Sequence, residues 1–106
     1  MRGTTMAYDI EKLQENIVEW LDKEHPGRKE QAVWAKYLEE LAEVMVDPSD
    51  IGEWADVIIV QLDLASRYGH FMDDILMVAT EKLEINKARK WEINKHGVMK
   101  HVKAQS

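Results

Sequence analysis

The chain has 106 residues, a formal net charge of −6 at pH 7 and no cysteine. This length fits a single domain, 1–106, with a modest core, and the acidity argues against binding to nucleic acid, which needs a basic surface to replace counterions. The absence of cysteine excludes disulfides and thiolate metal ligands. Because we find no apolar run of membrane-spanning length and no signal peptide, we expect a cytoplasmic protein that does not enter membranes.

Apolar residues at helical spacing predict an all-α protein with four helices. We expect residues 1–8 to form a flexible lead and the first helix to occupy 9–24, before the helix-breaking segment HPGR. The second helix is expected at 29–46. Its predicted apolar stripe consists of Trp34, Leu38, Leu41 and Met45.

The third helix is expected to begin at the sequence DPSD and to continue to Tyr68. We predict Asp47 as its N-cap and Pro48 as its first helical residue, because this pattern is a strong helix start. Apolar residues cover nearly the whole circumference of this helix, which is typical of a helix buried on most sides. In so small a domain, such a helix favours an oligomer.

The fourth helix is expected to open at Asp73 or Asp74 and to run through Trp91. Gly97 should end any further helix, which leaves 97–106 as a loose C-terminal tail.

Two pairs of acidic residues flank the expected turn between the second and third helices. Glu40 and Glu43 are three residues apart, as are Glu53 and Asp56, and this spacing places each pair on one helical face. The short connection favours an antiparallel hairpin in which the two pairs can meet. Oxygen ligands without nearby His or Cys suit Mg²⁺ or Mn²⁺ better than Zn²⁺. The alternatives are solvated acids or salt bridges to the basic fourth helix.

A basic strip is predicted on one face of the fourth helix, formed by Lys82, Asn86 and Arg89. Lysine and arginine bind phosphates, although basic residues near a helix C-terminus also simply favour the helix dipole. Together with the acidic pairs, the strip predicts a site for a metal-bound polyphosphate. Trp20 and Trp34 could stack on a purine base, but tryptophan at helical spacing more commonly belongs to a core.

The segments EELAE (39–43), EWAD (53–56) and KLEINKARKW (82–91) resemble, in order and helical placement, the signatures of the MazG-like all-α nucleoside triphosphate pyrophosphohydrolases. The similarity is strongest to a small branch that includes the MazZ proteins of phages that replace adenine with 2-aminoadenine. That branch is associated with dATP/dGTP pyrophosphohydrolase activity. The nine-residue gap between the first two motifs is shorter than in many relatives. The resemblance implies a four-helix MazG-like bundle assembled as an oligomer, either a homotetramer or a dimer.

The resemblance also implies roles for the acidic residues. It makes Glu40, Glu43, Glu53 and Asp56 ligands of two or three Mg²⁺ or Mn²⁺ ions per site. In the implied mechanism, Glu39 or Glu43 would orient the attacking water or accept its proton.

For the basic strip, the resemblance implies that Lys82 and Asn86 face the phosphates and that Lys82 stabilises the departing pyrophosphate. Arg89 is a candidate helper. Arg67 would either contact phosphate or close an ion pair.

The implied reaction cleaves a purine nucleoside triphosphate (dGTP, GTP or dATP) between its α- and β-phosphates, in the host cytoplasm if the protein is phage-encoded. Within enzymes, the alternative is a pyrophosphohydrolase for pyrimidine nucleotides or for damaged nucleotides. From another class, the chain could be a non-catalytic helical module whose acidic residues bind a basic partner.

Overall fold

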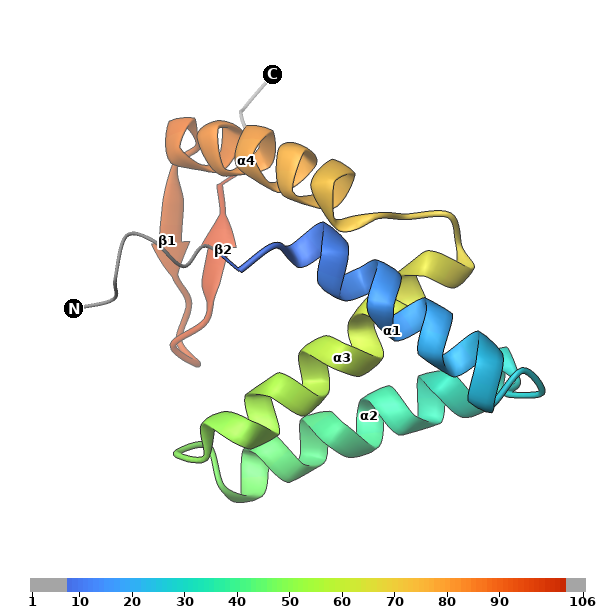
Figure 1. Cartoon of the computed structure of the whole chain (residues 1–106). Helices are drawn as coiled ribbons and strands as arrows, with labels where there is room; N and C mark the ends of the chain where they lie inside the picture. Colours follow the sequence, from blue (N-terminus) through green and yellow to red (C-terminus); the bar gives the residue numbers. More distant parts are fainter. Residues whose placement is uncertain (1–7, 103–106) are drawn as a thin grey trace. The chain divides into compact units, whose positions relative to one another are not determined.

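The computed structural model describes residues 8–102, which contain four helices followed by a two-stranded hairpin (Figure 1). The chain divides into two compact units, one ending at Asp74 and the other beginning at Ile75, and each is described by itself. Most of the predicted lead, and residues 103–106 of the predicted tail, lie outside the described residues. The elements are α1 (Ile10–Glu24), α2 (Glu30–Val46), α3 (Ile51–Arg67), α4 (Met72–Ala88), β1 (Trp91–Ile93) and β2 (Met99–His101).

In the first unit, α2 and α3 lie side by side and antiparallel, and α1 packs against α3 (Figure 1). The predicted α2–α3 hairpin is therefore confirmed. Among the described residues, no helix combines the length and the apolarity that crossing a membrane requires. The buried apolar side chains come from all three helices and are Ile17, Val33, Val44, Val57, Leu62 and Leu64.

One buried polar side chain, Gln14 on α1, fastens the connection between α3 and α4. Its amide nitrogen donates to the backbone carbonyls of Leu62 and His70 at 3.1 Å each, and its amide oxygen accepts from the Met72 backbone N–H at 2.8 Å. Gln14 is only 1% exposed, so these bonds satisfy polar groups that cannot reach water.

The turn between α2 and α3 corrects the predicted start of α3. Asp47 is the C-cap of α2, and the N-cap of α3 is Asp50, whose carboxylate accepts from the Gly52 N–H at 2.8 Å. Pro48 and Ser49 form the turn, with the Asp50 N–H donating to the Asp47 carbonyl at 3.2 Å. Both aspartates suit an N-cap, and the chain uses the first to reverse direction before the helix begins.

Two expectations about buried faces are wrong for the single chain. The buried face of α2 contains Val33, Glu40 and Val44, whereas the predicted stripe is mostly open, with Met45 81% exposed and only Leu41 half-buried. On α3, the side chain of Trp54 is 53% exposed, so this helix is not buried on most sides within one chain. Apolar side chains therefore cover an outer surface of the α2–α3 hairpin.

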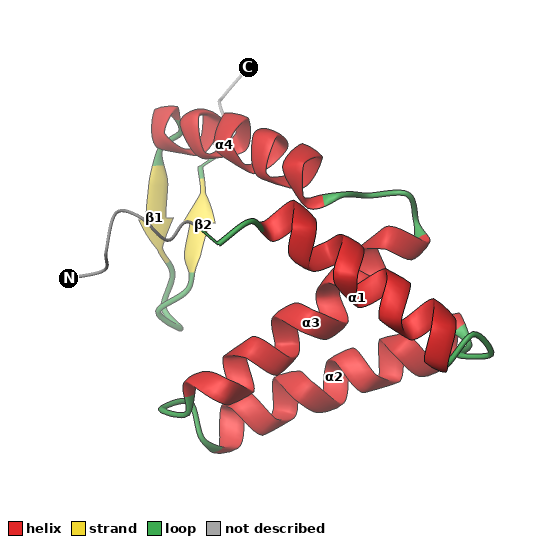
Figure 2. Ribbon diagram, viewed as in Figure 1, coloured by secondary structure: helices red, strands yellow, loops and turns green. Residues whose placement is uncertain are grey.

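The second unit differs from the prediction, because α4 stops at Ala88 and the described part of the predicted tail, 97–102, contributes to a strand hairpin (Figure 2). β1 and β2 pair in antiparallel register, with Trp91 opposite His101, so the protein is mostly helical rather than all-α. Asn94 shapes the turn by accepting the backbone N–H groups of His96 and Val98, and Gly97 adopts a positive φ of 76°. Strands of three residues are too short to show a period of two in the sequence.

Candidate functional site

Three of the four carboxylates predicted as metal ligands converge at one end of the α2–α3 hairpin. Glu40, Glu43 and Glu53 each offer an oxygen, and these atoms lie within 4.8 Å of one another. The helical spacing of the first two and the tight turn before α3 produce this convergence. Asp56 is exposed on the next turn of α3 and is not part of the group. Hereafter the carboxylate group means Glu40, Glu43 and Glu53.

The carboxylate group is only partly neutralised by the chain. Oε1 of Glu40 pairs with Lys36, but Oε2 of Glu40 and Oε2 of Glu53 are buried and have no hydrogen-bond partner. The pKa of Glu43 is raised, mainly by its side-chain hydrogen bond with Glu40 and by the charge of that carboxylate. Buried carboxylate oxygens without partners are costly, so this group fits a bound cation.

Lys36, which the sequence analysis missed, is the cation next to this group. Its ammonium nitrogen lies 3.0 Å from Oε1 of Glu40 and 3.9 Å from Oε1 of Glu39. The pKa of Lys36 is raised by its hydrogen bond with Glu40 and by the charge of Glu39. The signal available in the sequence was the Lys-x-x-x-Glu spacing, which places the two side chains on one helical face. Glu39 itself is exposed and lies outside the carboxylate group.

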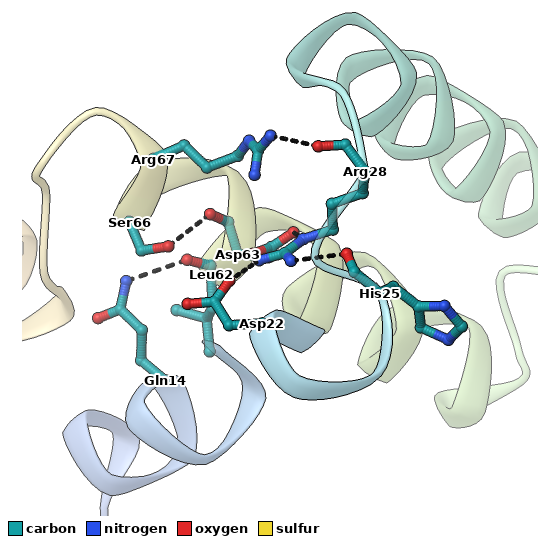
Figure 3. Close-up of polar contacts among 8 residues, drawn as sticks. All are labelled: Gln14, Asp22, His25, Arg28, Leu62, Asp63, Ser66 and Arg67. Atoms are coloured by element: carbon teal, nitrogen blue, oxygen red, sulfur yellow. Dashed lines mark hydrogen bonds and ion pairs between the residues drawn. The ribbon is translucent and has the colours of Figure 1, made fainter. Parts of the chain in front are cut away.

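A second buried acid, Asp63 on α3, is fully paired (Figure 3). Arg28 donates to both of its oxygens, at 3.0 and 2.7 Å, and also to Asp22 at 2.9 Å. Hydrogen bonding to Asp63 is the main reason that the pKa of Arg28 is raised. Of the two predicted roles for Arg67, the described contacts show neither, because its guanidinium donates to the Arg28 carbonyl at 2.7 Å. These contacts hold the connection between α1 and α2 against α3.

A cavity of about 350 Å³ lies between α1, α2 and α3. Its wall is largely apolar, with Trp20 from α1, Val33 from α2 and Ile59 from α3. Lys36 on α2 also lines this cavity, and the same side chain pairs with Glu40 of the carboxylate group. Its size and its apolar wall with a few polar groups are typical of small-molecule sites.

The two tryptophans predicted to stack on a base do not share a site. Trp20 borders the cavity and contacts His25 edge-on, with ring centroids 6.1 Å apart. Trp34 does not line the cavity, because it lies about 100° around α2 from Val33. The indole N–H of Trp34 donates to the Tyr68 hydroxyl at 2.8 Å.

The predicted basic strip belongs to the second unit and is shorter than expected. Lys82 is exposed on α4, and the half-buried Asn86 follows one turn later, where its backbone carbonyl accepts the Trp91 indole N–H at 2.6 Å. Arg89 lies beyond the end of α4 at Ala88 and therefore does not continue the helical face. The strip thus retains Lys82 and Asn86 on the helix.

The chain matches known proteins over nearly its whole length. The sequence model of the dATP/dGTP pyrophosphohydrolase family matches residues 12–106. The dATP/dGTP diphosphohydrolase of Cyanophage S-2L is 34% identical over 102 residues, which cover 92% of this chain and 91% of that protein. A protein of the same name from Salmonella phage PMBT28 is 36% identical over 101 residues, 94% of this chain but only 33% of that longer protein.

A solved structure is also similar. It is described as the MazG-like pyrophosphohydrolase of Cyanophage S-2L bound to dGDP and three catalytic Mn²⁺ ions per active site. The TM-score is 0.74 at 35% sequence identity, and the match covers 92% of this chain and 100% of the other. The fold and the sequence therefore point to the same group of proteins.

Proposed function

Because the chain belongs to the dATP/dGTP pyrophosphohydrolase family, we propose that it cleaves dGTP, GTP and dATP between the α- and β-phosphates. The products are the nucleoside monophosphate and pyrophosphate. The observation that carries this proposal is the convergence of Glu40, Glu43 and Glu53, two of which keep a buried oxygen without a partner.

The carboxylate group would hold Mg²⁺ or Mn²⁺, two or three ions per site, with Asp56 as a further ligand supplied by the family motif. The all-oxygen donor set suits these ions, and the unpaired oxygens of Glu40 and Glu53 carry negative charge that a cation would neutralise. When bound, such ions offset the charge of a triphosphate and make a water molecule more acidic. The relative of known structure carries three Mn²⁺ ions per active site, which agrees with this number.

Of the two candidate proton acceptors, Glu39 and Glu43, Glu43 is the better placed. It lies within the carboxylate group, whereas Glu39 lies outside that group. On α4, Lys82 and Asn86 would bind the phosphates, with Lys82 stabilising the charge of the departing pyrophosphate and Arg89 as a helper. The hydrogen bond of Arg67 to the Arg28 carbonyl favours a supporting role for Arg67.

The cavity would receive the purine base, with Trp20 as its aromatic wall. The cavity borders Lys36, which lies one helical turn before Glu40. A nucleotide whose base occupies the cavity would therefore direct its phosphates toward the carboxylate group. The position of Trp34 outside the cavity lining argues against a similar role for that residue.

The chain would act as a homotetramer or a dimer. No residue of α4 is buried within the described chain, although Leu76, Met77, Leu83 and Ile85 are apolar and at least 45% exposed. Apolar surface of this extent is typical of subunit interfaces. Light scattering after gel filtration measures the assembly directly, and a monomer at all concentrations would contradict it.

By removing purine nucleoside triphosphates, the enzyme would shape the nucleotide pool of the host cell. In a phage-encoded enzyme, this change in the pool would support the synthesis of phage DNA in which 2-aminoadenine replaces adenine.

The test is release of pyrophosphate from a panel of purine and pyrimidine nucleoside triphosphates, with and without Mn²⁺. We expect Mn²⁺-dependent turnover of dGTP and dATP that Glu43→Ala abolishes, while Glu19→Gln, an exposed acid on α1, retains wild-type turnover. Near wild-type turnover by a folded Glu43→Ala or Asp56→Ala variant would contradict the assignment of that ligand. Preference for dCTP or dTTP would contradict the purine assignment, and turnover of none of the nucleotides would favour a non-catalytic module.

A further inference from the structure

Lys36 occupies a position that the proposed reaction does not yet use. It lies one turn before Glu40 on α2, and its ammonium nitrogen is 3.0 Å from Oε1 of that carboxylate. The same side chain lines the 350 Å³ cavity together with Trp20 and Val33. Lys36 therefore stands between the proposed base cavity and the proposed metal ligands.

The two side chains of the Lys36–Glu40 ion pair differ strongly in their exposure to solvent. The Glu40 side chain is 8% exposed, whereas the Lys36 side chain is 52% exposed. Lysine precedes glutamate in the sequence, which is the weaker order for a pair on a helix. A half-solvated ammonium on a flexible four-carbon stem can leave its partner at little cost, while the buried carboxylate cannot move to water.

Metal binding would force this pair to change. Divalent ions held by the carboxylate group would lie close to the Lys36 ammonium, because that ammonium is only 3.0 Å from a Glu40 oxygen, and like charges at short distances repel strongly. Lys36 would then move away from Glu40. A nucleotide whose base occupies the neighbouring cavity would bring its negatively charged phosphates to the side of the cavity where Lys36 lies.

We propose that Lys36 is a displaceable counter-ion, which neutralises Glu40 until metal ions bind and then contacts the phosphate group adjoining the nucleoside. This inference rests on the proposed function, because it needs a nucleotide whose base occupies the cavity. It assigns Lys36 to the α-phosphate side of the scissile bond, whereas Lys82 is assigned to the departing pyrophosphate.

An ordinary surface ion pair is the competing explanation. Lys87 and Glu84 on α4 form such a pair at 3.1 Å, with side chains 62% and 68% exposed. The Lys36–Glu40 pair differs because its acid is buried and retains an unpaired oxygen. Lys87→Met is therefore a matched control for Lys36→Met.

The first measurement is calorimetric titration of the metal-free protein with Mn²⁺ in the absence of nucleotide. Lys36→Met removes the competing charge and should bind Mn²⁺ about threefold or more tightly than wild type. Lys87→Met should match wild type. Unchanged Mn²⁺ affinity in Lys36→Met would overturn the counter-ion role.

The second measurement is steady-state kinetics with dGTP at saturating Mn²⁺. Loss of a charge-assisted contact to phosphate should raise KM of Lys36→Met about tenfold or more, while Lys87→Met keeps the wild-type KM. Lys36→Arg, which keeps the charge, should restore KM to within about threefold of wild type. An unchanged KM in Lys36→Met would overturn the phosphate contact, even if Mn²⁺ binds more tightly.

The two proposals fail in distinguishable ways. Wild-type protein that releases no pyrophosphate from any nucleotide with Mn²⁺ contradicts the proposed function itself. Active wild-type protein whose Lys36→Met variant behaves like Lys87→Met contradicts only the role of Lys36. Circular dichroism of each variant excludes misfolding, and Lys36→Gln provides a second neutral variant if Lys36→Met does not fold.

Discussion

Asp63 and Glu40 are buried carboxylates of the same helical hairpin, yet the chain neutralises them very differently. Asp63 accepts two hydrogen bonds from a single guanidinium, which is itself held by Asp22. Glu40 has one half-solvated lysine and an oxygen without any partner. A buried carboxylate with all its hydrogen bonds satisfied holds neighbouring helices together, whereas a buried carboxylate with a free oxygen can still bind a ligand. The α2–α3 hairpin thus has a structural end, where the Arg28–Asp63 pair also borders the cavity, and a functional end at the carboxylate group.

The largest expected effect is at the structural end. Arg28→Met leaves the Asp63 carboxylate buried without its partner and should destabilise the fold by about 3 kcal/mol. Urea denaturation measures this loss. The double variant Arg28→Met, Asp63→Leu should recover most of it, because well-packed apolar residues often replace a buried ion pair at little cost. Equal instability of the double variant would show that the region depends on more than this pair.

At the functional end, removal of charge should have the opposite sign. In metal-free protein, Glu40→Gln combined with Glu53→Gln removes the charge of one buried and one half-buried carboxylate, each with a buried oxygen that lacks a partner, and should raise stability by about 1–2 kcal/mol. The same variant should lose the increase in melting temperature that Mn²⁺ gives the wild type. Thermal unfolding with and without Mn²⁺ tests both effects. A variant that is still stabilised by Mn²⁺ would place the ions elsewhere.

The pH dependence of the metal-free protein should report the repulsion around Glu43. A carboxyl group whose pKa is raised on folding contributes stability below its ordinary pKa of 4.5, and that contribution is lost as pH rises through the raised value. The melting temperature of wild type minus that of Glu43→Gln should therefore fall as pH rises from below 4.5. A constant difference across this range would mean that Glu43 does not feel its neighbours.

The carboxylate group was largely predictable from sequence because it depends on local rules. The three-residue spacing of Glu40 and Glu43 and the short turn before α3 determine which side chains meet. The partners that neutralise acids were harder to predict: Arg28 reaches Asp63 across 35 positions, and no local spacing indicates such a contact. The same limit hid Gln14, whose three bonds all reach residues far along the chain.

The faces of α2 show a different limit. Trp34 and Met45 belong to the apolar stripe predicted for α2, but the structure buries the face containing Val33, Glu40 and Val44. Periodicity identifies an apolar face without saying whether the same chain or a second copy covers it. The C-terminal hairpin was missed because its pairing depends on Asn94 and a turn, and not on strand periodicity.

The smallest expected effect is at an exposed acidic pair, Glu11 and Asp73, which can be compared with the carboxylate group. The pKa of Glu11 on α1 is raised, mainly by its side-chain hydrogen bond with Asp73 and by the charge of that residue, and both residues are exposed. As for Glu43, the repulsion between Glu11 and Asp73 is absent below pH 4.5, where Glu11 is protonated, and present at neutral pH. Glu11→Gln should therefore slightly raise the melting temperature at pH 7. High salt should remove this gain, because it screens exposed charges.

Metal distinguishes this solvated pair from the carboxylate group. For Glu11→Gln, the gain should be the same with and without Mn²⁺, because among the described residues Glu11 and Asp73 do not belong to a group of three carboxylates close enough to share an ion. Without metal, Glu43→Gln should likewise raise the melting temperature at pH 7, because it removes the repulsion at Glu43. With Mn²⁺, Glu43→Gln should instead lower the melting temperature, because a bound cation relieves the repulsion in wild type and the variant has lost a ligand. Thermal unfolding of both variants at pH 7, with and without Mn²⁺, makes the comparison. If Mn²⁺ reversed the gain in both, general screening would explain the result, and repulsion at Glu43 would no longer indicate a metal site.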